Sequence, residues 1–578
     1  MRRIQQQLDA SKFLTPAQSG FRKGRSCYDN IYQLTEAIQH SYTRGPASHL
    51  PVAFLDLQKA FDSVWHHGLI YKLSDYAHLP RSLIRWIQSF LTGRQLRVVQ
   101  SQHQSDWCPI TAGVPQGSVL APLLFLIFIN DLVKFKHEGT TLCLLADDVV
   151  LWPDAKGRYS TRYQTLQFSL QGCGEWAEMW KMKWSADKSN VVCFTKAKRL
   201  KAQVPTFHLG RIELKPARQY TYLGLTLQAN GKWDQHFNSI KKKAAYSSYL
   251  ISRVIQRHGP PTPATIRQLT IAIPRARMIW ALFFWQPNKS QYAAMDRILT
   301  LPLRSALHLP RSTSRAALFS EYGLASLQLT REYQQLAYAN RLLGRRSSSS
   351  SLASSSSASS PLSSSLHPVQ SLLEASYTRT GTSHQLYSKP YWQQLSQLQS
   401  QWHVDLRATN GLELKQQMLQ RQLQLYQQTP PSTSSPGLRP FKQAPGVSLY
   451  LYLDPKPIAA MRAKLRFDLA SLAGSVMGHR LDTASQACVL CDEPAADTRH
   501  HLLLHCPAMH RKRRELCLSL ISDGEDHLVD SDTACLSFLL GNLSSPNRRS
   551  EHARYALQQS GQFIQLVFAT RFHHSQAA

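Results

Sequence analysis

The alternation of apolar and polar residues divides the first 235 positions into strand-like and helix-like stretches. A continuous apolar run predicts a strand over residues 52–57. Residues 83–91 carry apolar side chains at helical spacing, and Gly93 follows as a stop signal. Further short strands are expected over residues 191–194 and 222–227. Together these elements predict a domain of the α+β class.

Two more apolar runs, residues 142–145 and 149–152, lie on either side of Ala146-Asp147-Asp148. Apolar runs separated by so short a polar segment are typical of a β-hairpin. Such a hairpin would carry Asp147 and Asp148 at its tip. Asp56 ends the strand predicted before it, so adjacent pairing of these strands would bring the carboxylates together.

The chain changes character after residue 235. Residues 236–345 are helical and basic in pattern. Residues 346–368 are rich in Ser and bury too little apolar surface to fold, which predicts a flexible linker, the alternative being a disordered loop within one domain. Residues 369–455 form a Gln-rich, helical and partly disordered region, with Leu412, Leu419, Leu423 and Tyr426 at helical spacing. Residues 456–578 are expected to form a C-terminal unit.

The charge of the chain points to a polyanionic partner. Lys and Arg total 67 against 36 Asp and Glu, a formal net charge of +31 over 578 residues. An excess this large favours nucleic acid. The longest apolar run, residues 119–129, is too short to cross a bilayer, so we expect no membrane partner.

The ten cysteines fit a reducing compartment. No signal-peptide core follows the first residues, so we expect a nuclear or cytoplasmic protein that is not secreted. Its cysteines would then be reduced thiols or metal ligands.

The three acidic residues have the chemistry of a nucleotidyl-transfer site. Phosphoryl transfer to a 3′-hydroxyl is served by two Mg²⁺ ions about 3.5–4 Å apart. Mg²⁺ prefers hard oxygen ligands and keeps several waters, so two or three carboxylates suffice. Asp56 and Asp147 are therefore candidate ligands, and Asp148 could bind one ion or hold the hairpin. Taken singly, each would be read as an ordinary polar turn residue.

Two glycine-containing segments accompany the carboxylates. Residues 113–118, Gly-Val-Pro-Gln-Gly-Ser, offer a backbone that a nucleotide or a template can approach closely. Residues 18–26 contain three cations and two glycines, which suits a loop facing phosphate. The alternative for residues 113–118 is a loop before a buried helix. The alternative for residues 18–26 is a basic surface turn.

The order of these segments resembles the reverse transcriptases of non-LTR (LINE-type) retrotransposons. The resemblance covers most of residues 1–345 and again about 456–575. It implies a right-hand polymerase with partial fingers and palm to about residue 235 and a helical basic thumb to about 345. The implied reaction is RNA-directed DNA polymerisation with two Mg²⁺ held by Asp56, Asp147 and Asp148. The implied partners are an RNA template, a DNA primer or target, and dNTPs.

The resemblance also assigns roles to single residues. Gln116 and Gly117 would lie against the incoming nucleotide and the template base, and Phe61 would exclude a 2′-hydroxyl. Arg22 would bind the nucleotide or the template, and Lys188 would lie near the leaving pyrophosphate, although a solvated lysine is the stronger reading of Lys188. Tyr222 and Gly224 match the hairpin that grips the primer end. Core packing is an equal alternative for Phe61.

The chain also departs from the family. Leu145 stands where an aromatic residue usually precedes Ala-Asp-Asp, which predicts altered fidelity or rate. The family's Arg-Pro-containing fingers motif, expected before residue 20, is not in this sequence, so we expect an N-terminally truncated polymerase. Target-primed reverse transcription would use an endonuclease supplied elsewhere. The alternatives are a catalytically impaired nucleic-acid-binding remnant and a group II intron-type maturase.

A cysteine and histidine cluster marks the C-terminal unit. Cys488 and Cys491 form a C-x2-C pair, and a histidine and Cys506 follow within 19 residues of its start. Thiolate and imidazole ligands at this spacing are typical of tetrahedral Zn²⁺, the alternative being reduced, unliganded cysteines. His500, His501 and His505 are all candidates. The resemblance to the zinc-binding segment that follows LINE-type reverse transcriptases selects His501.

Overall fold

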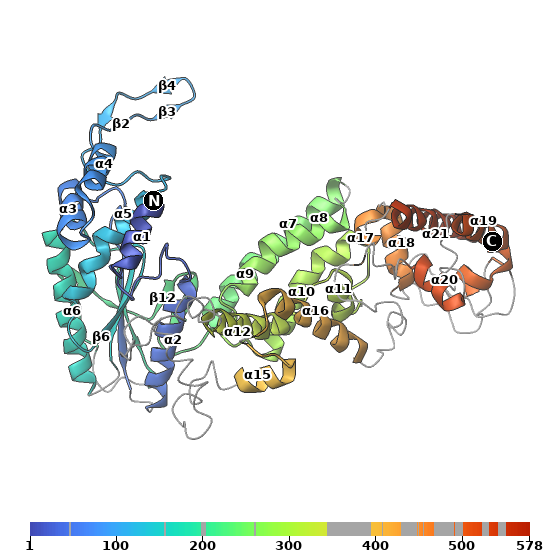
Figure 1. The fold of residues 1–578 in the computed structure, drawn as a ribbon. Helices are drawn as coiled ribbons and strands as arrows, with labels where there is room; N and C mark the ends of the chain where they lie inside the picture. Colours follow the sequence, from blue (N-terminus) through green and yellow to red (C-terminus); the bar gives the residue numbers. More distant parts are fainter. Residues whose placement is uncertain are drawn as a thin grey trace, which may run out of the picture. The chain divides into compact units, whose positions relative to one another are not determined.

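The computed structural model describes residues 1–44, 48–154, 158–197, 204–258, 262–311, 313–343, 395–406, 408–428, 448, 450–454, 456–466, 490–491, 501–522, 531–540 and 551–577. These residues separate into two units (Figure 1). One unit comprises Met1–His236, and the other comprises Phe237–Gly344 with Gln397–Ala578. The division at residue 236 falls next to the predicted end of the palm. The domain boundaries predicted at 345, 368 and 455 stay predictions.

The first unit is built on a five-stranded sheet with the strand order β11-β8-β1-β7-β6. β1 lies at its centre and pairs antiparallel with both β7 and β8. All six residues of β1 are buried, as expected for a continuous apolar run. The strands are β1 (Leu50–Leu55), β6 (Thr140–Leu145), β7 (Asp148–Pro153), β8 (Asn190–Phe194) and β11 (Pro216–Ala217).

Helices cover both faces of this sheet. α6 contacts β1, β6 and β7, whereas α2 contacts β6, and the two helices lie on opposite sides of the sheet (Figure 1). α5 is buried on every side except at Pro122, which explains its unbroken apolar sequence. The α-helices of this unit are α1 (Arg2–Ala10), α2 (Cys27–Thr43), α3 (His66–Tyr71), α4 (Arg81–Leu91), α5 (Ala121–Ile129) and α6 (Tyr159–Met179).

Short strands form hairpins outside the main sheet. Their bounds are β2 (Gln95–Leu96), β3 (Val99–Gln100), β4 (His103–Gln104), β5 (Cys108–Pro109), β9 (Phe207–Leu209), β10 (Ile212–Leu214), β12 (Gln219–Tyr222) and β13 (Leu225–Gln228). The prediction of one strand over residues 222–227 is wrong. Leu223 and Gly224 both have positive φ, at 47° and 85°, and this turn splits the segment into β12 and β13.

The regular secondary structure of the second unit, within its described residues, is helical. Its α-helices are α7 (Asp234–His258, which begins in the first unit), α8 (Pro263–Thr270), α9 (Ala276–Ile279), α10 (Lys289–Ala306), α11 (Arg315–Glu321), α12 (Leu327–Leu343), α15 (Leu395–Trp402), α16 (Gly411–Gln428), α17 (Tyr450–Leu453), α18 (Lys456–Arg466), α19 (His510–Ser522), α20 (Asp532–Leu539) and α21 (Glu551–Ala577). Among the described residues, no helix is long and apolar enough to span a bilayer.

Two features of the second unit differ from simple sequence patterns. Arg466 at the end of α18 forms a fully buried ion pair with Glu321 of α11, at 2.8 Å, so charged residues lie inside this core. α16 turns Leu414, Met418 and Leu423 inward. Leu412, predicted to be on the apolar face, is 67% exposed, because the buried stripe runs through positions spaced four apart from Leu414.

Candidate active site

The three predicted carboxylates meet at one edge of the central sheet. Asp56 directly follows β1, and Asp148 begins β7, the strand that pairs with β1 through Leu55 and Val149. Asp147 lies in the two-residue turn between β6 and β7. Antiparallel pairing thus brings Asp56 close to Asp147 and Asp148, which follow it by 91 and 92 positions in the sequence. The sheet register, rather than any local signal, assembles the cluster.

A loop from residue 183 to 189 wraps the end of β1 and carries Lys188 to the cluster. Ser185 N donates to Asp56 O at 2.8 Å, and Asp56 N donates to Ser189 Oγ at 3.2 Å. Lys188 Nζ lies 3.4 Å from Asp56 Oδ2, although its side chain is 71% exposed. Lys188 is therefore a largely solvated cation beside the carboxylates, and it is not part of a buried ion pair.

Electrostatics show that the carboxylates repel one another. The pKa of Asp148 is raised to about 6, chiefly by burial and then by the charges of Asp147 and Asp56, while Lys188 opposes them. The pKa of Asp147 is also raised, chiefly by burial and then by Asp56. Half-buried carboxylates crowded in this way favour a bound cation.

Gln18 holds the turn that carries Asp147. Its Oε1 accepts hydrogen bonds from Ala146 N at 2.9 Å and Gly20 N at 2.8 Å, and its Nε2 donates to Ala146 O at 3.4 Å. Gln18 is 1% exposed. A Cβ on Gly20 would lie 2.5 Å from Ala146 N, so only glycine lets the loop approach this closely.

Main-chain hydrogen bonds also join the same loop to β6. Ser19 N donates to Leu144 O and Leu144 N donates to Ala17 O, both at 2.9 Å. Asn30 Nδ2 of α2 also donates to Leu144 O at 2.9 Å. The sequence marked residues 18–26 as a phosphate-facing loop but gave no sign that Gln18 and Asn30 support the catalytic hairpin. Both side chains stand among other polar residues in the sequence, so their burial could be seen only in the folded chain.

Arg22 turns its guanidinium toward its own loop. Nη1 donates to Thr15 O at 2.6 Å and to Gln18 O at 3.3 Å, and burial lowers its pKa. These contacts stabilise the loop beside the hairpin. The predicted contact of Arg22 with the nucleotide or the template stays a prediction.

The Gly113 segment packs directly on the segment that follows Asp56. Val114 N donates to Phe61 O and Gly113 N donates to Val64 O, both at 2.8 Å. A Cβ on Gly113 would come within 2.7 Å of the Asp62 backbone. Gln116 Nε2 donates to Asp62 Oδ1 at 2.9 Å, which ties the two segments by their side chains as well.

Phe61 and Gly117 differ in what surrounds them. The Phe61 ring is half-buried and stacks on Phe125 of α5, with 4.6 Å between ring centroids. Gly117 has φ of 83°, and no atom lies within 4 Å of the position that its Cβ would take. The structure thus fixes Phe61 against the core and leaves open space at Gly117.

The β12–β13 hairpin packs on β1 and α2. Tyr220 stacks on Phe54 at 4.3 Å between centroids, and its hydroxyl donates to Lys188 O at 3.1 Å. Tyr222 is buried, 5.4 Å from the same Phe54 ring, while Gly224 forms the turn. The hairpin predicted to grip the primer is present. Through the Tyr220 hydroxyl it contacts the loop that carries Lys188.

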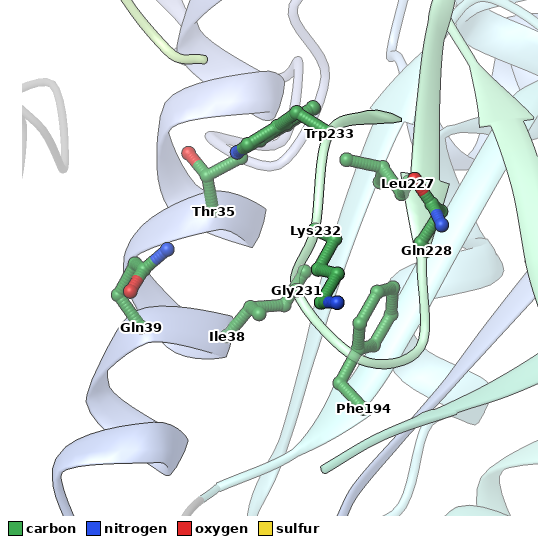
Figure 2. Close-up of a pocket in the computed structure, with 9 residues that line it drawn as sticks. All are labelled: Thr35, Ile38, Gln39, Phe194, Leu227, Gln228, Gly231, Lys232 and Trp233. Carbon is green, nitrogen blue, oxygen red and sulfur yellow. The ribbon is translucent and has the colours of Figure 1, made fainter. Parts of the chain in front are cut away.

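A small pocket lies where the segment after β13 meets α2. Figure 2 shows Thr35, Ile38 and Gln39 of α2 facing Leu227, Gln228 and the turn that contains Gly231 and Lys232, with Phe194 and Trp233 completing the lining. Its volume is about 20 Å³, which is room for about one water molecule. This pocket is a packing defect rather than a nucleotide site.

The structure gathers three of the four predicted zinc ligands in the second unit. Ligand atoms of Cys491, His501 and Cys506 all lie within 4.8 Å of one another, and Cys491 Sγ is 3.3 Å from His501 Nε2. Cys506 and His501 are buried. The predicted ligand Cys488 lies outside the described residues, as does the alternative His500. His505 is exposed.

Comparison with known proteins identifies the first unit. Residues 1–227 match the sequence profile of the family described as reverse transcriptase (RNA-dependent DNA polymerase). This region is therefore similar to reverse transcriptases. Relatives of the chain are named as RNA-directed DNA polymerases of mobile elements, in agreement with the type of protein that the sequence predicted.

The chain is 31% identical over 259 residues to the RNA-directed DNA polymerase from mobile element jockey of Drosophila melanogaster, covering 42% of this chain and 27% of that protein. It is 28% identical over 244 residues to the probable RNA-directed DNA polymerase from transposon X-element of the same species, covering 42% and 26%. The chain thus spans about a quarter of the length of these curated relatives.

Structural comparison adds a weaker likeness. Apo telomerase from Candida tropicalis, truncated from its C-terminal domain, superposes with a TM-score of 0.29 and 13% identity, covering 40% of this chain and 44% of that one. A TM-score this low carries no argument. The assignment rests on the sequence match and on the carboxylate site.

Proposed function

We propose that this chain is an RNA-directed DNA polymerase that extends a DNA primer on an RNA template from dNTPs. The observation that carries the proposal is the convergence of Asp56, Asp147 and Asp148 at adjacent strand ends within a reverse transcriptase domain. The relatives from jockey and X-element are named as RNA-directed DNA polymerases. The site's residue types match that chemistry.

The carboxylates fit divalent cations, and we assign them Mg²⁺. Asp56 Oδ2 is buried and accepts no hydrogen bond from the described residues, with only the exposed Lys188 nearby. Hard carboxylate oxygens are the donor set that Mg²⁺ prefers, and a bound cation would relieve the repulsion that raises the pKa values of Asp147 and Asp148. Two bound Mg²⁺ ions would activate the 3′-hydroxyl and neutralise charge on the leaving pyrophosphate.

The chain's own residues position this chemistry. Gln18 fixes the Ala146-Asp147 turn, so the Asp147 carboxylate is held before a substrate arrives. Lys188 supplies a cation that can move from Asp56 to a phosphate, since its side chain is largely exposed. The space above Gly117 would admit the nucleotide or the template base, and the Phe61 ring would then border the sugar.

A second metal site is proposed in the C-terminal region. Two thiols and an imidazole within 4.8 Å suit Zn²⁺, and Cys488 would be the fourth ligand. His501 is preferred because it is the histidine that the described residues place against Cys491. Closed sites of this kind stabilise small helical units that have little core of their own.

Primer extension tests the polymerase proposal. The purified chain is incubated with an annealed RNA template and DNA primer, dNTPs and Mg²⁺, alongside the Asp147→Asn variant. We expect extension by the unmodified chain and at least about a 100-fold loss in the variant, because charge stabilisation in the transition state is removed. Asp106→Asn, an exposed carboxylate outside the cluster, is the matched control and should extend normally.

The opposite outcome has a definite meaning. A folded chain that binds RNA but adds no nucleotide, under any divalent metal, would overturn the proposed activity. It would favour the catalytically impaired nucleic-acid-binding alternative. Extension that survives Asp147→Asn would instead show that another site or a contaminant acts.

A further inference from the structure

A basic cleft lies within the second unit, outside the carboxylate site. It is bordered by α10, α11, the start of α12 and α16, and its volume is about 1,120 Å³. α10 packs against α11, and α11 against α16 (Figure 1). The cations that line it are Lys289, Arg297, Arg304, Arg311 and Arg315, and the only carboxylate among its lining residues is Asp296.

The charges of this cleft are poorly compensated. Arg304 Nη2 donates to Thr313 O at 2.8 Å, and Arg315 Nη1 donates to Ala293 O at 3.1 Å. Both partners are neutral carbonyls. Burial lowers the pKa of Arg304, and the charges of Arg315 and Arg297 lower it further. Guanidinium groups crowded in this way favour a bound anion.

Two atoms at the cleft strengthen this point. Arg304 Nε is buried and has no hydrogen-bond partner among the described residues. The single Asp296 carboxylate is shared, because its charge acts on Arg275 as well as on Arg315 and its Oδ1 accepts from Leu327 N at 3.3 Å. An unpartnered buried donor beside uncompensated cations is costly unless a ligand supplies acceptors.

Apolar and aromatic side chains also line the cleft. Tyr292 is half-buried, and Ile298, Leu301, Phe319 and Leu425 contribute hydrocarbon surface. Cations that track a backbone, together with rings on which bases stack, are the features of single-strand recognition. The volume exceeds the roughly 300–1,000 Å³ of a typical small-molecule pocket, which favours a segment of polymer over one nucleotide.

We propose that this cleft binds a single-stranded RNA segment, with phosphates at Arg297, Arg304, Arg311 and Arg315 and a base against Tyr292. The site is built entirely from the second unit. It does not depend on catalysis at the carboxylates, so it stands or falls separately from the polymerase proposal.

Salt-dependent binding of a fluorescent single-stranded RNA to the full chain tests the phosphate contacts. The variant Arg297→Gln with Arg311→Gln removes two exposed cations of the cleft and leaves the half-buried Arg304 and Arg315 in place. We expect about a tenfold weaker affinity and a salt slope reduced by about 1.4, which is ~0.7 for each lost contact. Arg211→Gln with Lys215→Gln removes the same charge from exposed positions of the first unit and should change affinity less than twofold.

A second pair of variants tests stacking. Tyr292→Ala should weaken binding about tenfold without changing the salt slope, whereas Tyr292→Phe, which keeps the ring, should bind normally. The binding assay contains no primer, dNTP or Mg²⁺, which separates this site from the polymerase proposal. Equal losses in the cleft and control pairs would overturn the proposal. So would equal affinity for duplex RNA, or full competition by an acidic peptide of the same charge.

Discussion

The side chain of Gln18 and the backbone of Ala146 share two hydrogen bonds across 128 positions of sequence. Oε1 accepts from Ala146 N at 2.9 Å, and Nε2 donates to Ala146 O at 3.4 Å. Ala146 has φ of 56°, in the left-handed region that non-glycine residues seldom adopt. The amide of Gln18 thereby stabilises a backbone conformation that positions Asp147.

Replacing Gln18 with the similarly sized Met should impair catalysis more than substrate binding. Ala146 N and Gly20 N would lose their acceptor, at about 1–3 kcal/mol for each buried donor. The turn would loosen, so we expect kcat to fall at least about tenfold while KM for dNTP changes little. Steady-state primer extension measures both. Gln88→Met, on the exposed face of α4, is the control; an unchanged kcat in Gln18→Met would contradict the role.

Two glycine substitutions should separate a clash from backbone strain. Gly20→Ala places a Cβ 2.5 Å from Ala146 N, so the catalytic turn must shift and single-turnover incorporation should fall about 100-fold. Gly117→Ala meets no atom within 4 Å, so its effect on folding is confined to the left-handed conformation, about 1–2 kcal/mol. Thermal unfolding and incorporation rate are measured together. A fully active Gly20→Ala variant would refute the close-approach argument.

Removing one carboxylate should stabilise the metal-free protein while abolishing activity. Asp147 and Asp56 both raise the pKa of Asp148, so their repulsion opposes folding when no cation is bound. Asp148→Asn should therefore raise the Tm in the presence of a chelator and lower the further rise produced by Mg²⁺. Differential scanning fluorimetry with and without Mg²⁺ measures this. A lower Tm in chelator would mean that Asp148 stabilises the hairpin instead.

The pH dependence of stability should change in Asp296→Asn. The pKa of Asp296 is raised to about 6 from 3.8, so the folded state holds its proton more tightly than the unfolded chain. Its contribution to stability is full below pH 3.8 and is lost as the pH rises through 6, by on the order of 3 kcal/mol. Arg275 and Arg315 face this carboxylate and reduce the effect.

Asparagine does not titrate, so the gap in Tm between the variant and the unmodified chain should widen from pH 4 to pH 7, in favour of the variant. Asn Oδ1 can still accept from Leu327 N, which keeps the local hydrogen bond. Asp106→Asn serves as an exposed control. A constant gap across this range would show that Asp296 titrates normally.

Removal of zinc should unfold the region around Cys506. Chelation is expected to lower the Tm of the second unit, and Cys506→Ala should lower bound zinc, measured by mass spectrometry, from one equivalent to none. Cys108→Ala, an exposed cysteine of the first unit, is the control and should keep its zinc. Metal-free protein with an unchanged Tm would leave Cys491, His501 and Cys506 as reduced, unliganded side chains.

Much of the polymerase domain could be predicted from local sequence. Apolar runs located β1, β6, β7 and β8 to within two residues, because a buried strand needs a continuous run of hydrophobic side chains. The residue types Asp56, Asp147 and Asp148 indicated a metal site, since few other side chains bind Mg²⁺. Family resemblance supplied the candidate roles of the remaining residues.

Other features appeared only in the folded chain. Register decided that Leu55 pairs with Val149 and that Asp56 therefore neighbours Asp148. Burial decided that Gln18 faces Ala146, and packing of separate helices made the cleft around Arg304. Sequence by itself determines which side chains and which local periods are available. Long-range pairing and the burial of polar groups depend on segments that are far apart in sequence, 92 positions for Asp56 and Asp148 and 128 for Gln18 and Ala146, so only the tertiary structure decides which of those side chains act together.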